Sequence, residues 1–259
     1  MRRLPVPIAV LAVLGVALVV LPVAALLIRA EWSNVGELLT GEGATTALRL
    51  SVLVSLAAAA ISVLLGVPLG YVLARIRFPG RAFVRGAVVL PLVLPPVVGG
   101  IGLLQGLGRS GVVGRWLYEA LGIQLTFTVW GAIVAAAFVS IPLVILASEA
   151  GFRSLDERYE RTASALGATP SVVLRRVTLP LALPQIAAGA VLAWARALGE
   201  FGATITFAGN FPGRTQTLPL AVYQARQSDP GSAVLLSILL IVLSVGVIVA
   251  LGDRITGAR

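Results

Sequence analysis

The sequence contains no cysteine, no histidine and no lysine, and each absence removes a class of function. Without cysteine there are no disulfides or thiolate metal sites, and without histidine there is no imidazole acid–base catalysis. A phosphate-binding loop of the Gly-x-x-x-x-Gly-Lys-Ser/Thr type needs a lysine, so the chain cannot complete one. We therefore expect a protein that is not an enzyme, binds no metal or other cofactor, and relies on a separate polypeptide for any ATP hydrolysis.

Charge is also scarce, because only 12% of the 259 residues are charged while 58% are hydrophobic. A helix needs about 20 apolar residues to cross a bilayer. The sequence predicts an all-α integral membrane protein, a bundle of about six transmembrane helices with no large domain outside the membrane. The predicted spans are 5–28, 46–74, 84–107, 127–148, 182–208 and 232–251.

The first apolar run follows Met1-Arg2-Arg3, as a secretory signal would. Its 24 residues exceed the about 7–15 of a signal peptide's apolar region, so we expect an uncleaved first span within residues 1–30.

All of the basic side chains are arginines, and their placement predicts the orientation. Six spans put both termini on one side, together with the 75–85 connection and the segment 149–181, and this side holds thirteen of the twenty arginines. The positive-inside rule therefore predicts a multi-pass protein of the plasma (inner) membrane with cytoplasmic termini, ending in a short tail at 253–259. Nucleic-acid binding is the alternative interpretation of the net charge of +9. It is rejected because the arginines are dispersed, and membrane lipid is the expected surrounding.

The segment 149–181 is charged and lies between two apolar spans, yet it has the pattern of two short helices. The spacing of Ser154 and Glu157 predicts a capping box at a helix start. Gly167 suits a left-handed residue after the helix end, and Thr169-Pro170 predicts a new helix with Thr as cap and Pro in the first position. The expected apolar face consists of Leu155, Tyr159, Ala163 and Leu166. A helix–turn–helix between spans indicates a surface presented to a soluble partner.

At these residues the chain resembles a known family. Arg161-Thr-Ala-Ser-Ala-Leu-Gly167-Ala-Thr-Pro170, followed by Val177-Thr-Leu-Pro180, is similar to the cytoplasmic coupling loop of permease subunits of ABC importers. In that family the loop docks into a cleft of the ATPase. The family's Glu-Ala-Ala begins six residues before the glycine, where this chain has Arg161, and Glu160 comes one place earlier. The resemblance implies that the ATPase-coupling residues are Glu160, Arg161, Ala163, Leu166, Gly167, Ala168, Thr169 and Pro170.

The fifth predicted span contains two charges, Arg196 and Glu200, four residues apart and therefore on one face of a helix. Charges within a membrane normally face the bundle interior or a wet cavity. Two interpretations remain open: a self-neutralising ion pair that locks helices together, or a polar lining of a path in which Arg196 attracts an anion. Thr204 would continue the same stripe.

The third predicted span is interrupted by prolines and glycines, with Pro95-Pro96 near its middle. A proline kinks a transmembrane helix. This predicts either a kinked helix that lines a path and forms part of a gate, or only close helix packing. Small residues also predict close helix approach at Gly66…Gly70 and at Gly102…Gly106. The candidate path residues are thus Arg196, Glu200, Thr204, Pro95 and Pro96.

The run from Ala195 to Asn210, Ala-Arg-Ala-Leu-Gly-Glu-Phe-Gly-Ala-Thr-Ile-Thr-Phe-Ala-Gly-Asn, is similar to molybdate/tungstate permeases. Sulfate/thiosulfate permeases share its first half and diverge after Ala203. The resemblance covers about residues 45–252, the expected permease core of a type I ABC importer. It implies a homodimer with two ATPase subunits, which use the ATP, and an extracytoplasmic oxyanion-binding protein. The alternatives are a sulfate/thiosulfate importer and a secondary transporter, which would need coupling-ion sites and usually inverted repeats.

Overall fold

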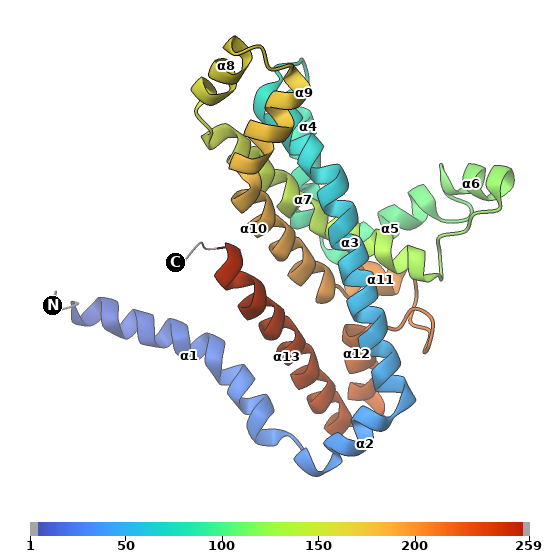
Figure 1. Ribbon diagram of the computed structural model, residues 1–259. Helices are drawn as coiled ribbons and strands as arrows, with labels where there is room; N and C mark the ends of the chain where they lie inside the picture. Colours follow the sequence, from blue (N-terminus) through green and yellow to red (C-terminus); the bar gives the residue numbers. More distant parts are fainter. Residues whose placement is uncertain (1–4, 256–259) are drawn as a thin grey trace.

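The computed structural model describes the backbone of residues 5–255, which form helices and short connections without any strand (Figure 1). The all-α prediction is confirmed. The elements are α1 Val6–Arg29, η1 Trp32–Asn34, α2 Val35–Thr40, α3 Glu42–Arg75, α4 Arg81–Val93, α5 Pro96–Leu107, α6 Gly114–Leu121, α7 Val129–Ser154, α8 Glu157–Ala165, α9 Pro170–Val173, the π-helical turn η2 Leu174–Thr178, α10 Leu179–Leu198, α11 Gly202–Phe207, α12 Leu218–Ser228 and α13 Pro230–Ile255.

The centre of the bundle is formed by α3, α7 and α10, whose contact surfaces are rich in small residues. A Cβ at Gly66 would lie 3.1 Å from the Val144 Cβ, and a Cβ at Gly70 would lie 2.7 Å from the Ser148 Cβ. The close approach predicted at Gly66…Gly70 is therefore confirmed. At Gly102…Gly106 the prediction is wrong, since a Cβ at either glycine meets nothing within 4 Å.

Several helices are suited to a membrane. Four stretches are long and apolar enough to cross one: α1, α3, α7 and the combined stretch Pro170–Leu198. A fifth span results if α4 and α5 are counted as one broken span. The sixth predicted segment lies within α13, a 26-residue helix that is apolar over its described part Pro230–Gly246. The chain is an integral membrane protein, and the count of six spans stays a prediction.

Two of the predicted spans are not continuous helices. The interruption predicted for 84–107 is confirmed, and it is sharper than a kink, because α4 and α5 meet at 119° across Leu94-Pro95. Each of these residues precedes a proline and is extended, with ψ of 138° and 133°. Whether the two helices form one span stays a prediction. The continuous helix predicted over 182–208 is wrong: α10 ends at Leu198, and α11 begins only at Gly202.

The two ends of the chain differ in how they pack. No residue of α1 is buried, and Figure 1 shows this helix diverging from the rest of the bundle. Its Val23 and Leu27 line a crevice together with Ile238 and Ile241 of α13. At the other end α13 continues to Ile255. The first part of the predicted tail is therefore helical, and 256–259 lies outside the described residues.

The contact of α3 with α7 predicts the effect of one added methyl group. We expect Gly70→Ala to destabilise the protein by about 1–3 kcal/mol, because the new Cβ overpacks the helix contact. Gly43→Ala is the matched control in the same helix, since a Cβ there meets nothing within 4 Å. Thermal unfolding in detergent should show a lower Tm for the first variant alone. Equal melting temperatures for the two variants would contradict the assigned contact.

Candidate coupling and translocation sites

The charged segment begins its first helix with a different cap from the predicted one. The Asp156 carboxylate accepts the Arg158 N–H at 2.9 Å, which makes Asp156 the cap of α8. Ser154 is the last residue of α7, and its hydroxyl donates to the Gly151 carbonyl at 2.8 Å. The predicted Ser154–Glu157 capping box is wrong because α7 extends six residues beyond the predicted span end at 148. A nearer carboxylate then takes the position of the cap.

The turn after α8 is built around Gly167, whose φ of +85° confirms the predicted left-handed conformation. The Ala168 N–H donates to the Ala163 carbonyl at 3.1 Å, which closes the end of the helix. Pro170 occupies the first position of α9, as predicted. Thr169 is at the cap position, but its hydroxyl pairs with that of Ser171 at 3.1 Å and not with a helix N–H.

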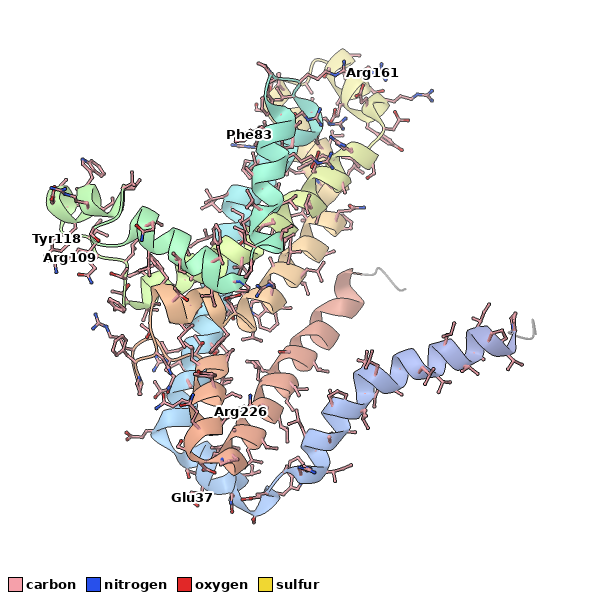
Figure 2. All side chains as sticks on the ribbon, turned by 180° about the vertical axis from the view of Figure 1, so that it is seen from behind. Glu37, Phe83, Arg109, Tyr118, Arg161 and Arg226 are labelled. Carbon is pink, nitrogen blue, oxygen red and sulfur yellow. The ribbon has the colours of Figure 1, made fainter. Side chains whose placement is uncertain are left out.

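The outer surface of α8 and of Leu166, the residue that follows it, is exposed and partly apolar. Tyr159 is 60% exposed and Leu166 is 84% exposed, although both belong to the predicted apolar face. Arg161 projects from the same end of the molecule (Figure 2). Large apolar side chains beside charged ones at the end of a bundle are typical of a surface that another protein covers.

Glu160 fixes α8 to the bundle. Its Oε1 accepts a hydrogen bond from Arg75 Nη2 at 3.2 Å and one from Thr178 Oγ1 at 2.8 Å. Arg75 also pairs with Glu157 at 3.6 Å. One carboxylate thus connects α8 to the last residue of α3 and to η2, which leads directly into α10. The sequence analysis predicted Glu160 but not its partners, because no local spacing links residues 85 positions apart.

The two breaks in the predicted spans contact each other. Pro96 is the first residue of α5, and Gly202 is the first residue of α11. A Cβ at Gly202 would lie 2.8 Å from the Pro96 Cβ, and a Cβ at Gly100 would lie 2.6 Å from the Thr206 Cβ. Pro95, the cap of α5, lies in the α4–α5 break itself. The structure therefore brings the prolines predicted for one span against the break in another.

The predicted ion pair is present at the second break. Arg196 Nη1 lies 2.5 Å from Glu200 Oε2, with side-chain exposures of 33% and 2%. The other oxygen, Oε1, accepts the Ala203 N–H at 2.8 Å at the start of α11. The pair is not on one helix face as predicted, because Glu200 lies beyond the end of α10. Thr204 is buried on α11 and does not continue a stripe on the helix of Arg196.

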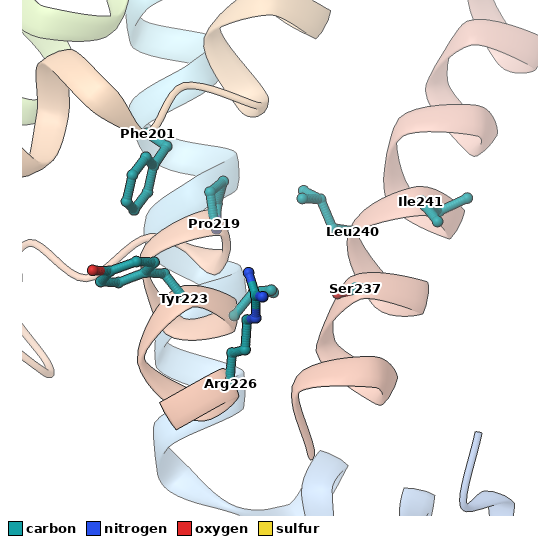
Figure 3. A pocket seen from close by; sticks show the side chains of 8 residues that line it. Phe201, Pro219, Tyr223, Arg226, Ser237, Leu240 and Ile241 are labelled. Atoms are coloured by element: carbon teal, nitrogen blue, oxygen red, sulfur yellow. The ribbon is translucent and has the colours of Figure 1, made fainter. Parts of the chain in front are cut away.

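A pocket of about 380 Å³ lies beside this break, between α12 and α13 (Figure 3). Phe201, the neighbour of Glu200, lines it and packs against Tyr223 with ring centroids 5.0 Å apart. Arg226 lines the same pocket. The Arg196–Glu200 pair does not line it, so the pocket and the pair are separate features. Over the described residues, no group of three or more acidic, histidine or cysteine side chains could hold a metal ion.

Comparisons with known proteins agree with this architecture. Residues 66–257 match the family model of the binding-protein-dependent transport system inner membrane component. The molybdenum transport system permease protein ModB of Mycobacterium bovis is 47% identical over 243 residues, covering 94% of this chain and 92% of that protein. The sulfate transport system permease protein CysT of Escherichia coli is 32% identical over 251 residues, covering 93% and 90%.

The fold is similar to that of a solved transporter. In the crystal structure of a bacterial alginate ABC transporter in complex with an alginate pentasaccharide-bound periplasmic protein, one chain superposes with a TM-score of 0.74 at 20% identity, covering 96% of this chain and 93% of that one. The family model matches well over half of the chain, which is enough to assign the family. The chain belongs to the family of binding-protein-dependent transport system inner membrane components.

Proposed function

We propose that this chain is the transmembrane permease subunit of an ATP-driven importer that carries molybdate or tungstate across the plasma membrane. The observation that carries the proposal is the 47% identity to a molybdenum permease over nearly the full chain, against 32% to a sulfate permease. The match extends through the run Ala195–Asn210, which contains the ion pair. A sulfate importer is the alternative in the same family.

The proposed assembly is a homodimer of permeases with two ATPase subunits and an extracytoplasmic oxyanion-binding protein. The lack of any lysine for a phosphate-binding loop supports ATP hydrolysis on a separate subunit. The exposed apolar side chains of α8 support its docking to that subunit. The arginine distribution supports cytoplasmic termini and a cytoplasmic α8.

In the proposed mechanism, movement of the ATPase reaches the bundle through Glu160. The hydrogen bonds of Glu160 join α8 to α3 through Arg75 and to η2 through Thr178. Since η2 continues into α10, a displacement of α8 is transmitted along α10 to the break at Gly199-Glu200-Phe201. We propose that this break and the α4–α5 break, which contact each other, form the gate.

Arg196 supplies the charge for the path. Glu200 Oε2 neutralises it, but Arg196 keeps 33% of its side chain exposed and thus has N–H donors left for an anion. A tetrahedral dianion is well matched to such donors, because charge-assisted hydrogen bonds are stronger than neutral ones.

The substrate assignment predicts selective uptake. Vesicles containing the permease, its ATPase and its binding protein should take up radioactive molybdate in the presence of ATP, and excess tungstate should compete better than excess sulfate. Vesicles without ATP are the control. Uptake of sulfate with no uptake of molybdate would replace the proposal by the sulfate alternative.

The coupling role predicts the effect of a change at Gly167. Gly167→Val should uncouple or dissociate the ATPase while the permease still inserts, because a β-branched residue is penalised at positive φ. Gly122→Val is the matched control: Gly122 also has positive φ, and at both glycines a Cβ meets nothing within 4 Å. Copurification of the ATPase and oxyanion-stimulated hydrolysis are the readouts. Wild-type values of both for Gly167→Val would rule out docking through this turn.

The path role of Arg196 predicts a different pattern. Arg196→Gln should slow oxyanion uptake while ATPase binding persists. If the pair is only structural, the single change should reduce folded yield, since it leaves Glu200 buried and unpaired. Arg196→Gln combined with Glu200→Gln should then restore yield and transport together. Oxyanion uptake, normalised to the amount of inserted permease, separates the path-lining role from the structural one. Full transport by the double variant would rule out the path-lining role of Arg196.

A further inference from the structure

Glu149, near the end of α7, is a buried carboxylate to which the sequence analysis assigned no role. Its side chain is 2% exposed, and three arginines surround it. Arg153 Nη2 lies 2.8 Å from Oε1, Arg85 Nε lies 3.4 Å from Oε2, and Arg81 Nη2 lies 3.9 Å from Oε1. Arg81 and Arg85 come from the first two turns of α4, whereas Arg153 is one turn further along α7.

The charges of this cluster do not balance. Three guanidinium groups face one carboxylate, which leaves two positive charges in excess. Neither oxygen of Glu149 has a well-aligned hydrogen bond among the described residues, so the contacts are charge pairs with open geometry. The arginine side chains keep 27%, 48% and 41% of their surface exposed for Arg81, Arg85 and Arg153. Each guanidinium has five N–H donors, and most of them remain available to a ligand.

We infer that Arg81, Arg85 and Arg153 form a second anion site, distinct from the Arg196–Glu200 pair, that binds a tetrahedral oxyanion group. A group with two negative charges would neutralise the excess, and its oxygens suit the planar donors of arginine. Glu149 is a positioning residue in this site: it holds the guanidinium groups together and cancels only one of their three charges. The inference relies on the proposed function for the cytoplasmic location of the site.

The location suits an ion that has passed the gate. An Nη2–H of Arg81 donates to the carbonyl of Leu73, two residues before Arg75, which binds Glu160. Figure 2 shows Phe83 of α4 and Arg161 of α8 at the same end of the molecule. The second anion site is therefore close to the coupling surface, on the helix that leads to the α4–α5 break.

A phospholipid headgroup is a second possible source of the tetrahedral anionic group. A groove of about 550 Å³ runs along α4 from Arg85, and its other walls are Ala82, Gly86, Val89, Leu90 and Val93. This apolar groove could hold an acyl chain while its phosphate headgroup occupies the arginines. A transported oxyanion and an anionic phospholipid thus present the same kind of group to the site.

Equilibrium binding to the purified full-length permease with its ATPase tests the site. Radioactive molybdate, sulfate and phosphate are measured in detergent, for the wild type and for single variants. Arg85→Gln and Arg153→Gln should each weaken binding at this site about tenfold, the size of one charge-assisted hydrogen bond. Glu149→Gln should strengthen it, because the amide keeps the shape of the side chain and an acceptor oxygen for the arginines while the competing negative charge is removed. Arg77→Gln is the control: Arg77 is exposed on the same connection and has no ion pair among the described residues.

The lipid source is measured separately, in nanodiscs of phosphatidylcholine with or without phosphatidylglycerol. Binding of a free oxyanion that depends on Arg85 supports the site with the transported ion as its ligand. Retention of phosphatidylglycerol that depends on Arg85, without ion binding, supports the site with a headgroup as its ligand. If neither depends on Arg85, the inference is overturned.

Two features keep these results interpretable. If the buried change Glu149→Gln prevents folding, Arg85→Gln alone decides the test, because the Arg85 side chain is 48% exposed. Arg85→Gln should weaken anion binding to the same extent when Arg196 is also changed to Gln, since the two sites are distinct. Failure of the proposed function would appear as absent molybdate uptake, whereas failure of the second anion site would leave uptake normal and binding independent of Arg85.

Discussion

The hydrocarbon core of a bilayer offers no hydrogen bonds to an open backbone, and the rest of this structure depends on that constraint. Long helices satisfy their own backbone, as α3 and α7 do. The two breaks cannot, so each needs local compensation. At the α4–α5 break the prolines have no N–H to satisfy. At the α10–α11 break the Glu200 carboxylate accepts the Ala203 N–H at 2.8 Å. The two breaks also pack against each other, since a Cβ at Gly202 would lie 2.8 Å from the Pro96 Cβ.

Three carboxylates mark the junctions between helices: Glu149 and Glu200 are buried, and Glu160 is 24% exposed. Glu160 joins α8 to α3 and η2, Glu149 joins α7 to α4, and Glu200 joins the end of α10 to the start of α11. Each has at least one arginine partner, which is the usual condition for a carboxylate away from water. At Glu149 and Glu200, removing the arginine partners leaves a buried charge, so we expect these two junctions to be more sensitive to single changes than the alanine-rich contacts around them. Charge pairing therefore determines where the helices are joined, and small residues determine how closely they pack.

The sequence was a good guide wherever a local pattern determines the outcome. Apolar runs predicted the positions of the helices, and Gly167 and Pro170 predicted the turn between α8 and α9. The sequence-based prediction was wrong where two local interactions compete for the same position. Asp156 replaced Ser154 as the cap, and Pro95-Pro96 broke the third span instead of kinking it. It was also uninformative about contacts between distant residues, such as Thr178 with Glu160 and Arg85 with Glu149, since periodicity along one helix does not reveal its neighbour.

The arrangement of the junctions suggests how one motion could reach two breaks. The stretch Pro170–Leu198 has 29 residues and is about 43 Å long at 1.5 Å per residue, so a tilt imposed at η2 displaces its far end. Glu160 connects that stretch to α3 through Arg75, and Arg81 connects α3 to α4 through the carbonyl of Leu73. The helices that end at the two breaks are therefore linked at the coupling end as well as at the breaks. In the proposed mechanism, α4 and α10 are connected through α3 at one end and through the contact of the two breaks at the other. A displacement of α8 therefore moves the two breaks together.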